Sequence, residues 1–185
     1  MKNGNEKTVF VVQSGSGEHG MLSEEGKRQM EALKEYIGMI TLGEYKTTDV
    51  RRLLVNFSVL HVASASILHL RKGGESYFVM EPPDFQKTKK VLRKETVLKE
   101  QKLLESAFGE MMGLASHWNA SVIVIVAQGP VAIVLAEIAY KKFTGCRKDL
   151  GEGLGFGAGL CIIPKPDSSC GIVSISSGGI IPLLL

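Results

Sequence analysis

The sequence predicts an α/β protein of three layers, in which helices cover both faces of a central, mostly parallel sheet. Short apolar segments rich in β-branched residues alternate with longer segments whose apolar residues recur at helical spacing. The short segments are apolar throughout rather than at every second position, which is typical of parallel strands buried on both faces. Polar residues and glycine follow these strands, and ligands bind at such turns in open α/β sheets.

Two predicted strands carry most of this evidence, Val9–Val12 and Val122–Val126. The turns that follow them supply the predicted ligand-binding residues, which are Gln13, Ser14, Gly15, Gln128 and Gly129. None of these side chains is charged at neutral pH, and a serine hydroxyl is a weak nucleophile without a neighbouring base. The sequence therefore predicts a well-placed pocket that lacks charged groups.

The elements between these two strands are predicted from caps and spacing. A helix is expected to begin at Ser23, whose hydroxyl can cap free N–H groups, and Met30, Leu33 and Ile37 give this helix one apolar face. Further along, the expected elements are strands at Val55–Ala63 and Tyr77–Met80 and helices at Lys87–Trp118 and Val131–Phe143.

The last part of the chain, residues 151–185, differs in composition from the rest. Glycine occupies every second position from Gly151 to Gly159, which predicts either a strand with one bare face or a flexible loop. Closing strands are expected at Leu160–Ile163 and Gly171–Ser176. A chain of 185 residues suits a single domain over residues 1–185.

Composition narrows the classes of function. A net charge of +3 and a hydrophobic fraction of 44% are those of an ordinary soluble globular protein. The three cysteines and four histidines lack metal-ligand spacing, so we expect a reduced, cytoplasmic chain with no metal and no cofactor. No apolar run reaches the roughly 18–20 residues of a membrane span, so no membrane association is expected. The basic residues from Lys87 to Lys102 are expected to form a solvated helix face without aromatic residues for base stacking, so no nucleic-acid partner is expected.

Three segments resemble the histidine phosphatase superfamily, the phosphoglycerate mutase-like proteins. The family has Arg-His-Gly after its first strand and then a helix start of the form Leu-Thr-x-x-Gly-x-Arg-Gln; here Gln-Ser-Gly ends at Gly15, and Leu22–Gln29 reads Leu-Ser-Glu-Glu-Gly-Lys-Arg-Gln. Val122–Gly129 is similar to the family's second histidine turn, with Ala-Gln-Gly in place of Ser-His-Gly. Val62–Leu68 resembles its Ser-Ser-Pro-Leu-x-Arg segment. The resemblance spans roughly Val9–Gly145 and implies the phosphoglycerate mutase-like fold.

In that family one histidine is phosphorylated, two arginines and a second histidine hold the phosphoryl group, and a carboxylate acts as the acid. Carried onto this chain, the first arginine becomes Gln13 and the nucleophilic histidine becomes Ser14. The second arginine becomes Leu68, and the second histidine becomes Gln128. Glu81 lies near the position of the acid. The resemblance thus implies the family's site without its cations and its nucleophile.

This loss has a direct chemical consequence. A phosphate dianion that enters a pocket loses hydration, which fixed cations and charge-assisted hydrogen bonds must replace. Phosphoryl transfer depends almost wholly on positioning and charge stabilisation. We therefore predict a catalytically inactive, phosphatase-like protein that acts by binding a small polar ligand or a protein partner, or by forming homo-oligomers.

Three alternatives stay open at this point. The chain could be a phosphatase-like hydrolase with non-histidine chemistry, in which Ser14, His19 and Glu81 converge. It could bind a nucleotide through the glycines of the G-x-G-x-x-G pattern, Gly15, Gly17 and Gly20, although the helix is expected to begin later than that motif requires. The polar turn residues could also simply satisfy backbone groups, with no ligand.

Overall fold

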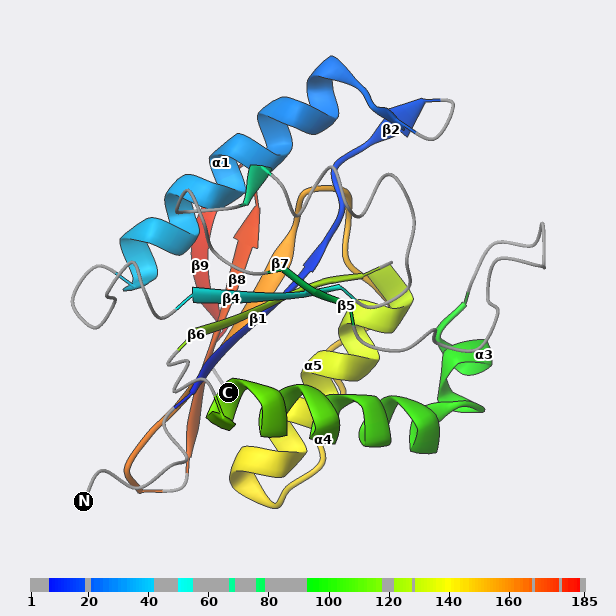
Figure 1. Cartoon of the computed structure of the whole chain (residues 1–185), viewed down its shortest axis with the longest axis vertical. Coiled ribbons are helices and arrows are strands. Elements are labelled where there is room, and N and C mark those ends of the chain that lie inside the picture. The colour runs from blue at the N-terminus through cyan, green and yellow to red at the C-terminus, as the bar shows by residue number, and fades with distance from the viewer. Residues whose placement is uncertain are drawn as a thin grey trace.

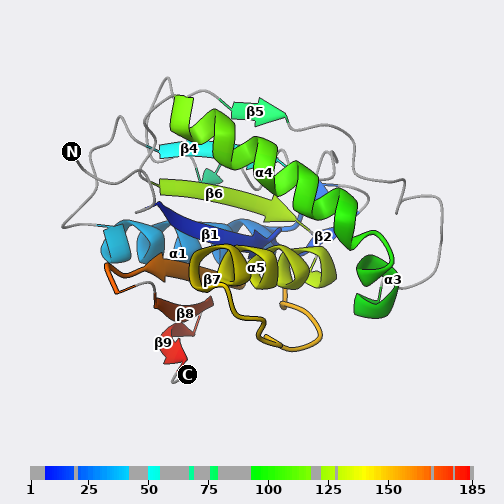
Figure 2. The same cartoon turned by 90° about the horizontal axis from the view of Figure 1, so that it is seen from below.

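A computed structural model describes residues 7–18, 21–41, 50–54, 67–68, 76–78, 93–117, 122–127, 129–167, 169–176 and 178–183. Within these residues a central sheet has the strand order β5-β4-β6-β1-β7-β8-β9. The bounds of these strands are β1 Thr8–Gln13, β4 Val50–Leu54, β5 Ser76–Phe78, β6 Val122–Ala127, β7 Gly159–Pro164, β8 Cys170–Ser176 and β9 Gly179–Leu183. Helix α1 (Glu24–Thr41) covers one face, and α4 (Gln101–His117) and α5 (Gly129–Thr144) cover the other (Figures 1 and 2). The predicted α/β class, with helices on both faces of a central sheet, is confirmed.

The sheet is mixed in direction. Strands β1, β4, β5 and β6 are mutually parallel, whereas β7, β8 and β9 extend the sheet in antiparallel pairing. Short turns join the last three strands, and a short turn can connect only antiparallel neighbours. The two expected closing strands correspond to β7 and β8, and β9 adds an edge strand to this half of the sheet.

The two faces of the sheet bury separate apolar clusters. On β1, Val9 and Val11 pack in the cluster formed with α4 and α5, whereas Phe10 and Val12 pack in the cluster on the α1 side. Strand β6 alternates in the same way and is buried along its whole length. Burial on both faces explains why these strands are apolar at every position.

Helix α1 begins and packs as its sequence predicts. The hydroxyl of Ser23 accepts a hydrogen bond from the Gly26 N–H at 3.0 Å, which is the expected N-cap. Met30, Leu33 and Ile37 are fully buried against the sheet. Before this helix, β2 (Gly17–Glu18) and β3 (Met21–Leu22) form a small antiparallel ladder.

The long helix expected over Lys87–Trp118 is two helices in the described residues, α3 (Lys94–Leu98) and α4. The division falls at Glu100, whose N–H donates to Val97 while its carbonyl accepts the N–H of Leu103 and begins the next helix. Residues 87–92 and Trp118 lie outside the described residues.

The remaining elements are described in part. The strand expected at Val55–Ala63 lies outside the described residues, and β4 precedes it. The strand expected at Tyr77–Met80 overlaps β5, with residues 79–80 outside the described residues. Helix α5 runs from Gly129 to Thr144 and ends at Gly145, which has a φ of +73°, as a helix-stop glycine should. Within the described residues, no helix has the length and apolar character needed to cross a membrane.

Candidate functional site

The turns after β1 and β6 leave the same edge of the sheet side by side. The parallel register pairs Gln13 with Ala127, so the two strands end side by side at this edge. Ser14 is only 3% exposed, and Gly129 is buried at the start of α5. Gln128 and Glu81 lie outside the described residues, so their places in the site stay predictions. The structure therefore brings together Gln13 and Gly129 and leaves Ser14 buried beside them.

The Gln13 side chain lies directly against Gly129. A Cβ atom added to Gly129 would lie 2.3 Å from Gln13 Oε1, so a larger residue here would displace the Gln13 side chain. Gln13 Oε1 is buried and has no hydrogen-bond partner within the described part of the chain. An unpaired buried polar atom is costly and calls for a water or a ligand group. A neutral amide can accept or donate a hydrogen bond, but it brings no positive charge to this edge.

A glycine-rich segment, residues 151–158, packs its backbone over both turns; we call it the strap. The Gln13 N–H donates to the Ala158 carbonyl at 2.8 Å, and the Gly157 N–H donates to the Ser14 carbonyl at 3.1 Å. At the second turn, a Cβ on Gly129 would lie 2.5 Å from the Leu154 carbonyl oxygen. The strap has no strand structure, so the expected bare strand face is wrong here. Missing side chains instead let two backbone segments approach closely.

Leu68 belongs to the apolar core rather than to a polar site. It is 1% exposed and packs in the α1-side cluster with Phe10, Val12 and Met30. The position that the resemblance gives to the family's second arginine therefore carries a buried aliphatic side chain.

The glycine turn after β1 uses its donors within the protein. The Ser16 N–H donates to Gln29 Oε1 at 2.9 Å, and the hydroxyls of Ser16 and Ser23 are 2.9 Å apart. A Cβ on Gly15 would lie 2.4 Å from the Gly26 carbonyl oxygen, so this glycine serves close packing of the turn on α1. A nucleotide-binding turn instead offers its N–H groups to phosphate at the start of the helix. His19 and Gly20 lie outside the described residues.

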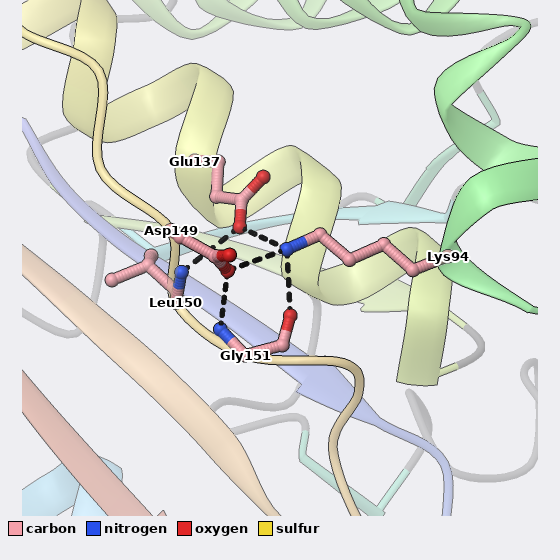
Figure 3. A network of polar contacts seen from close by, with 5 residues as sticks. All are labelled: Lys94, Glu137, Asp149, Leu150 and Gly151. Carbon is pink, nitrogen blue, oxygen red and sulfur yellow. Dashed lines mark hydrogen bonds and ion pairs between the residues drawn. The ribbon is translucent and has the colours of Figure 1, made fainter.

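The sequence did not predict an ion cluster that forms around a buried lysine. Lys94, expected on a solvated face, is 7% exposed, and its Nζ donates to Glu137 Oε1 at 2.6 Å, Asp149 Oδ1 at 2.7 Å and the Gly151 carbonyl at 2.7 Å (Figure 3). The Leu150 N–H also donates to Glu137 Oε1 at 2.9 Å. No local pattern marks this cluster, because 43 and 55 residues separate Lys94 from its two carboxylates.

The pairing shifts the pKa values of Lys94 and Asp149. Burial acts to lower the pKa of Lys94, but hydrogen bonds to Asp149 and Glu137 outweigh burial, and the pKa is raised. The hydrogen bond from Lys94 also lowers the pKa of Asp149. The pairing therefore favours the charged forms of Lys94 and Asp149. The hydrogen bonds of Lys94 also tie α3 and α5 to Gly151, the first residue of the strap. Within the described residues, no group of three His, Cys, Asp or Glu side chains could hold a metal ion.

Comparison with known proteins supports the fold. No family model matches the chain, and no curated protein matches its sequence. Among solved structures, a protein of Escherichia coli K-12 described as an alpha-ribazole-5′-P phosphatase superposes with a TM-score of 0.56 at 10% identity, covering 97% of this chain and 100% of its own. The chain has a histidine phosphatase-like fold.

A second structure, described as the phosphohistidine phosphatase SixA of Nakamurella multipartitia, aligns with a TM-score of 0.46 at 10% identity over 96% of this chain and 94% of its own. At 10% identity, the first match establishes the fold and transfers no activity.

Proposed function

We propose that this chain is a catalytically inactive protein of histidine phosphatase-like fold that acts by binding. One observation carries the proposal. The described residues of the two turns, Gln13, Ser14, Gly15 and Gly129, include no charged side chain, and backbone from the strap packs over them.

Two physical effects act together against phosphate chemistry at this edge. A phosphate group would find neutral hydrogen bonds in place of the charge-assisted bonds that must replace its hydration. The strap backbone beside this turn is hydrogen-bonded to the Gln13 N–H and the Ser14 carbonyl. Removal of the cations takes away the main catalytic contribution to phosphoryl transfer.

The geometry disfavours phosphoryl transfer but not binding, so we propose binding as the role of this chain. We propose a protein partner, a second copy of the chain or a small polar ligand as the bound species. A cytoplasmic location is part of the same proposal, supported by three free cysteines, of which Cys161 and Cys170 are buried.

Turnover of para-nitrophenyl phosphate and phosphosugars, from acidic to neutral pH, tests the proposal. We expect no release of phosphate above buffer from the wild type or from Ser14→Ala. The matched control is Ser106→Ala, which removes a hydroxyl from the exposed face of α4. Turnover that Ser14→Ala abolishes and Ser106→Ala retains would establish the altered hydrolase instead.

A nucleotide-binding role is not favoured by the geometry. The Ser16 N–H of the turn is bonded to Gln29, and the Ser23 hydroxyl caps the helix start, so neither group is free to hold a pyrophosphate. A melting temperature unchanged by ATP or NAD is expected, because only a ligand of the folded state raises it.

A further inference from the structure

A second concave site lies between α3, α5 and the segment that follows α5. Its volume is about 290 Å³, and Lys94, Glu137 and Asp149 form part of its wall. None of its lining residues belongs to the turns after β1 and β6. Figure 3 shows the same three elements meeting around the Lys94 side chain.

Apolar side chains line part of this pocket. Val134 and Ile138 are nearly fully buried on α5, and Leu98 reaches the pocket from α3. Leu98 is 40% exposed, although it lies on a helix whose Val97 is fully buried. A concave surface that leaves a large aliphatic side chain in water favours contact with an apolar group.

The charged side chains that line the pocket carry a net positive charge, because Lys94, Arg147 and Lys148 face two carboxylates. Lys94 pairs with both nearby carboxylates, those of Glu137 and Asp149. Arg147 and Lys148 also line the pocket, and neither side chain has an ion pair or hydrogen bond in the described part of the chain. Glu105, the carboxylate whose pKa Arg147 helps to lower, is already paired with Lys141.

We propose that this pocket binds a small organic anion. The apolar part of this ligand contacts Leu98, Val134 and Ile138, and Arg147 and Lys148 bind its anionic group. The volume lies at the lower end of ligand pockets, which span about 300–1,000 Å³, so the ligand is smaller than a typical drug molecule. The proposal adds a ligand to the binding role proposed above, and it does not depend on whether the two turns can hydrolyse phosphate.

Three probes with one apolar group and different charge test this site: phenylacetate, 2-phenylethanol and 2-phenylethylamine. Binding is measured on the full chain by saturation-transfer NMR and titration. We expect phenylacetate to bind with a Kd on the order of 1 mM, as suits so small a ligand, and the alcohol and the amine to bind more weakly in that order.

The double variant Arg147→Ala/Lys148→Ala locates the binding. We expect this variant to bind phenylacetate about fivefold more weakly, since each exposed charge contact changes the affinity by at most a few-fold. Its melting temperature should be unchanged. The matched control is Arg28→Ala/Lys34→Ala, which removes the same two residue types from α1 on the opposite face. We expect this control to bind as the wild type does.

Absence of phenylacetate binding, equal binding of the three probes, or equal weakening by both double variants would overturn the proposal. Phosphatase turnover on the same samples bears only on the function proposed above, because these variants leave Gln13, Ser14 and Gly129 intact. The two proposals can therefore fail separately.

Discussion

Leu68 shows most clearly how a residue's surroundings decide its role. The resemblance places it where the family has a phosphate-binding arginine, and the structure places it 1% exposed in an apolar cluster. A charge at a fully buried apolar position loses its hydration without gaining a partner. The side chain therefore serves the core, and restoring the family's arginine conflicts with the folding of this chain.

Substitution of Leu68 tests this role. We expect Leu68→Ala to lower the free energy of unfolding by about 2–5 kcal/mol, Leu68→Met by less than about 1.5 kcal/mol, and Leu68→Arg by more than Leu68→Ala. Urea denaturation followed by circular dichroism measures the three values. A Leu68→Arg variant as stable as the wild type, with new affinity for phosphate, would mean that this side chain reaches the site.

At the scale of elements, the strap and the Lys94 cluster determine which backbone lies against the edge of the sheet where β1 and β6 end. The strap is hydrogen-bonded to Gln13 and Ser14 at the end of β1. Lys94 holds the beginning of the strap through Gly151, and it holds Asp149, which precedes the strap. Local sequence patterns predicted the elements that flank this edge, because β1, β6 and the start of α1 are specified by consecutive residues. They did not predict the strap's position or the cluster, because both depend on contacts between distant segments.

Two glycines of the strap form a matched pair for mutation. Gly157 has a φ of +62°, and a Cβ there would lie 2.5 Å from Gln29 Cβ, whereas a Cβ on Gly155 meets nothing within 4 Å. We expect Gly157→Ala to lower the free energy of unfolding by about 1–3 kcal/mol and Gly155→Ala to leave it unchanged or slightly raised. Denaturant unfolding with hydrogen exchange at the Gln13 N–H measures both effects. Equal effects of the two substitutions would contradict close packing of the strap.

The contribution of the Lys94 ion pairs to stability should depend on pH in a defined way. Lys94→Met should lower the free energy of unfolding by about 2 kcal/mol at neutral pH, since it leaves the partly buried carboxylate of Glu137 without its cation. The raised pKa of Lys94 means that pairing stabilises the fold below its ordinary value of 10.5 and is lost as pH rises through the folded-state pKa. The lowered pKa of Asp149 means that its contribution to the stability of the fold is present above the ordinary value of 3.8. This contribution is lost as pH falls through the folded-state pKa.

The difference between wild type and Lys94→Met should therefore shrink at strongly alkaline and at strongly acidic pH. Lys27→Met is the matched control, because Lys27 pairs with Glu24 on the exposed face of α1. Its expected effect is at most about 0.5 kcal/mol. If both lysine substitutions have the same small effect at every pH, the cluster does not anchor the strap.

At the scale of the whole molecule, the α/β fold places uncharged residues in the described parts of the turns after β1 and β6. The α/β class, the helices on both faces and the strand-to-turn positions of Gln13, Ser14 and Gly129 follow from hydrophobic periodicity, which the two buried clusters reproduce. The antiparallel half of the sheet was less predictable, since the direction of a short buried strand depends on its connections rather than on its composition. The roles of Gln128 and Glu81 stay predictions, because they lie outside the described residues.

A crystal structure after soaking in orthovanadate, which mimics a phosphoryl group in transfer, tests the central claim most directly. We expect the strap to remain bonded to Gln13 and Ser14 and no vanadate to occupy the edge between the turns after β1 and β6. Vanadate bonded to Ser14, or held between these turns by an arginine or lysine from elsewhere in the chain, would contradict it.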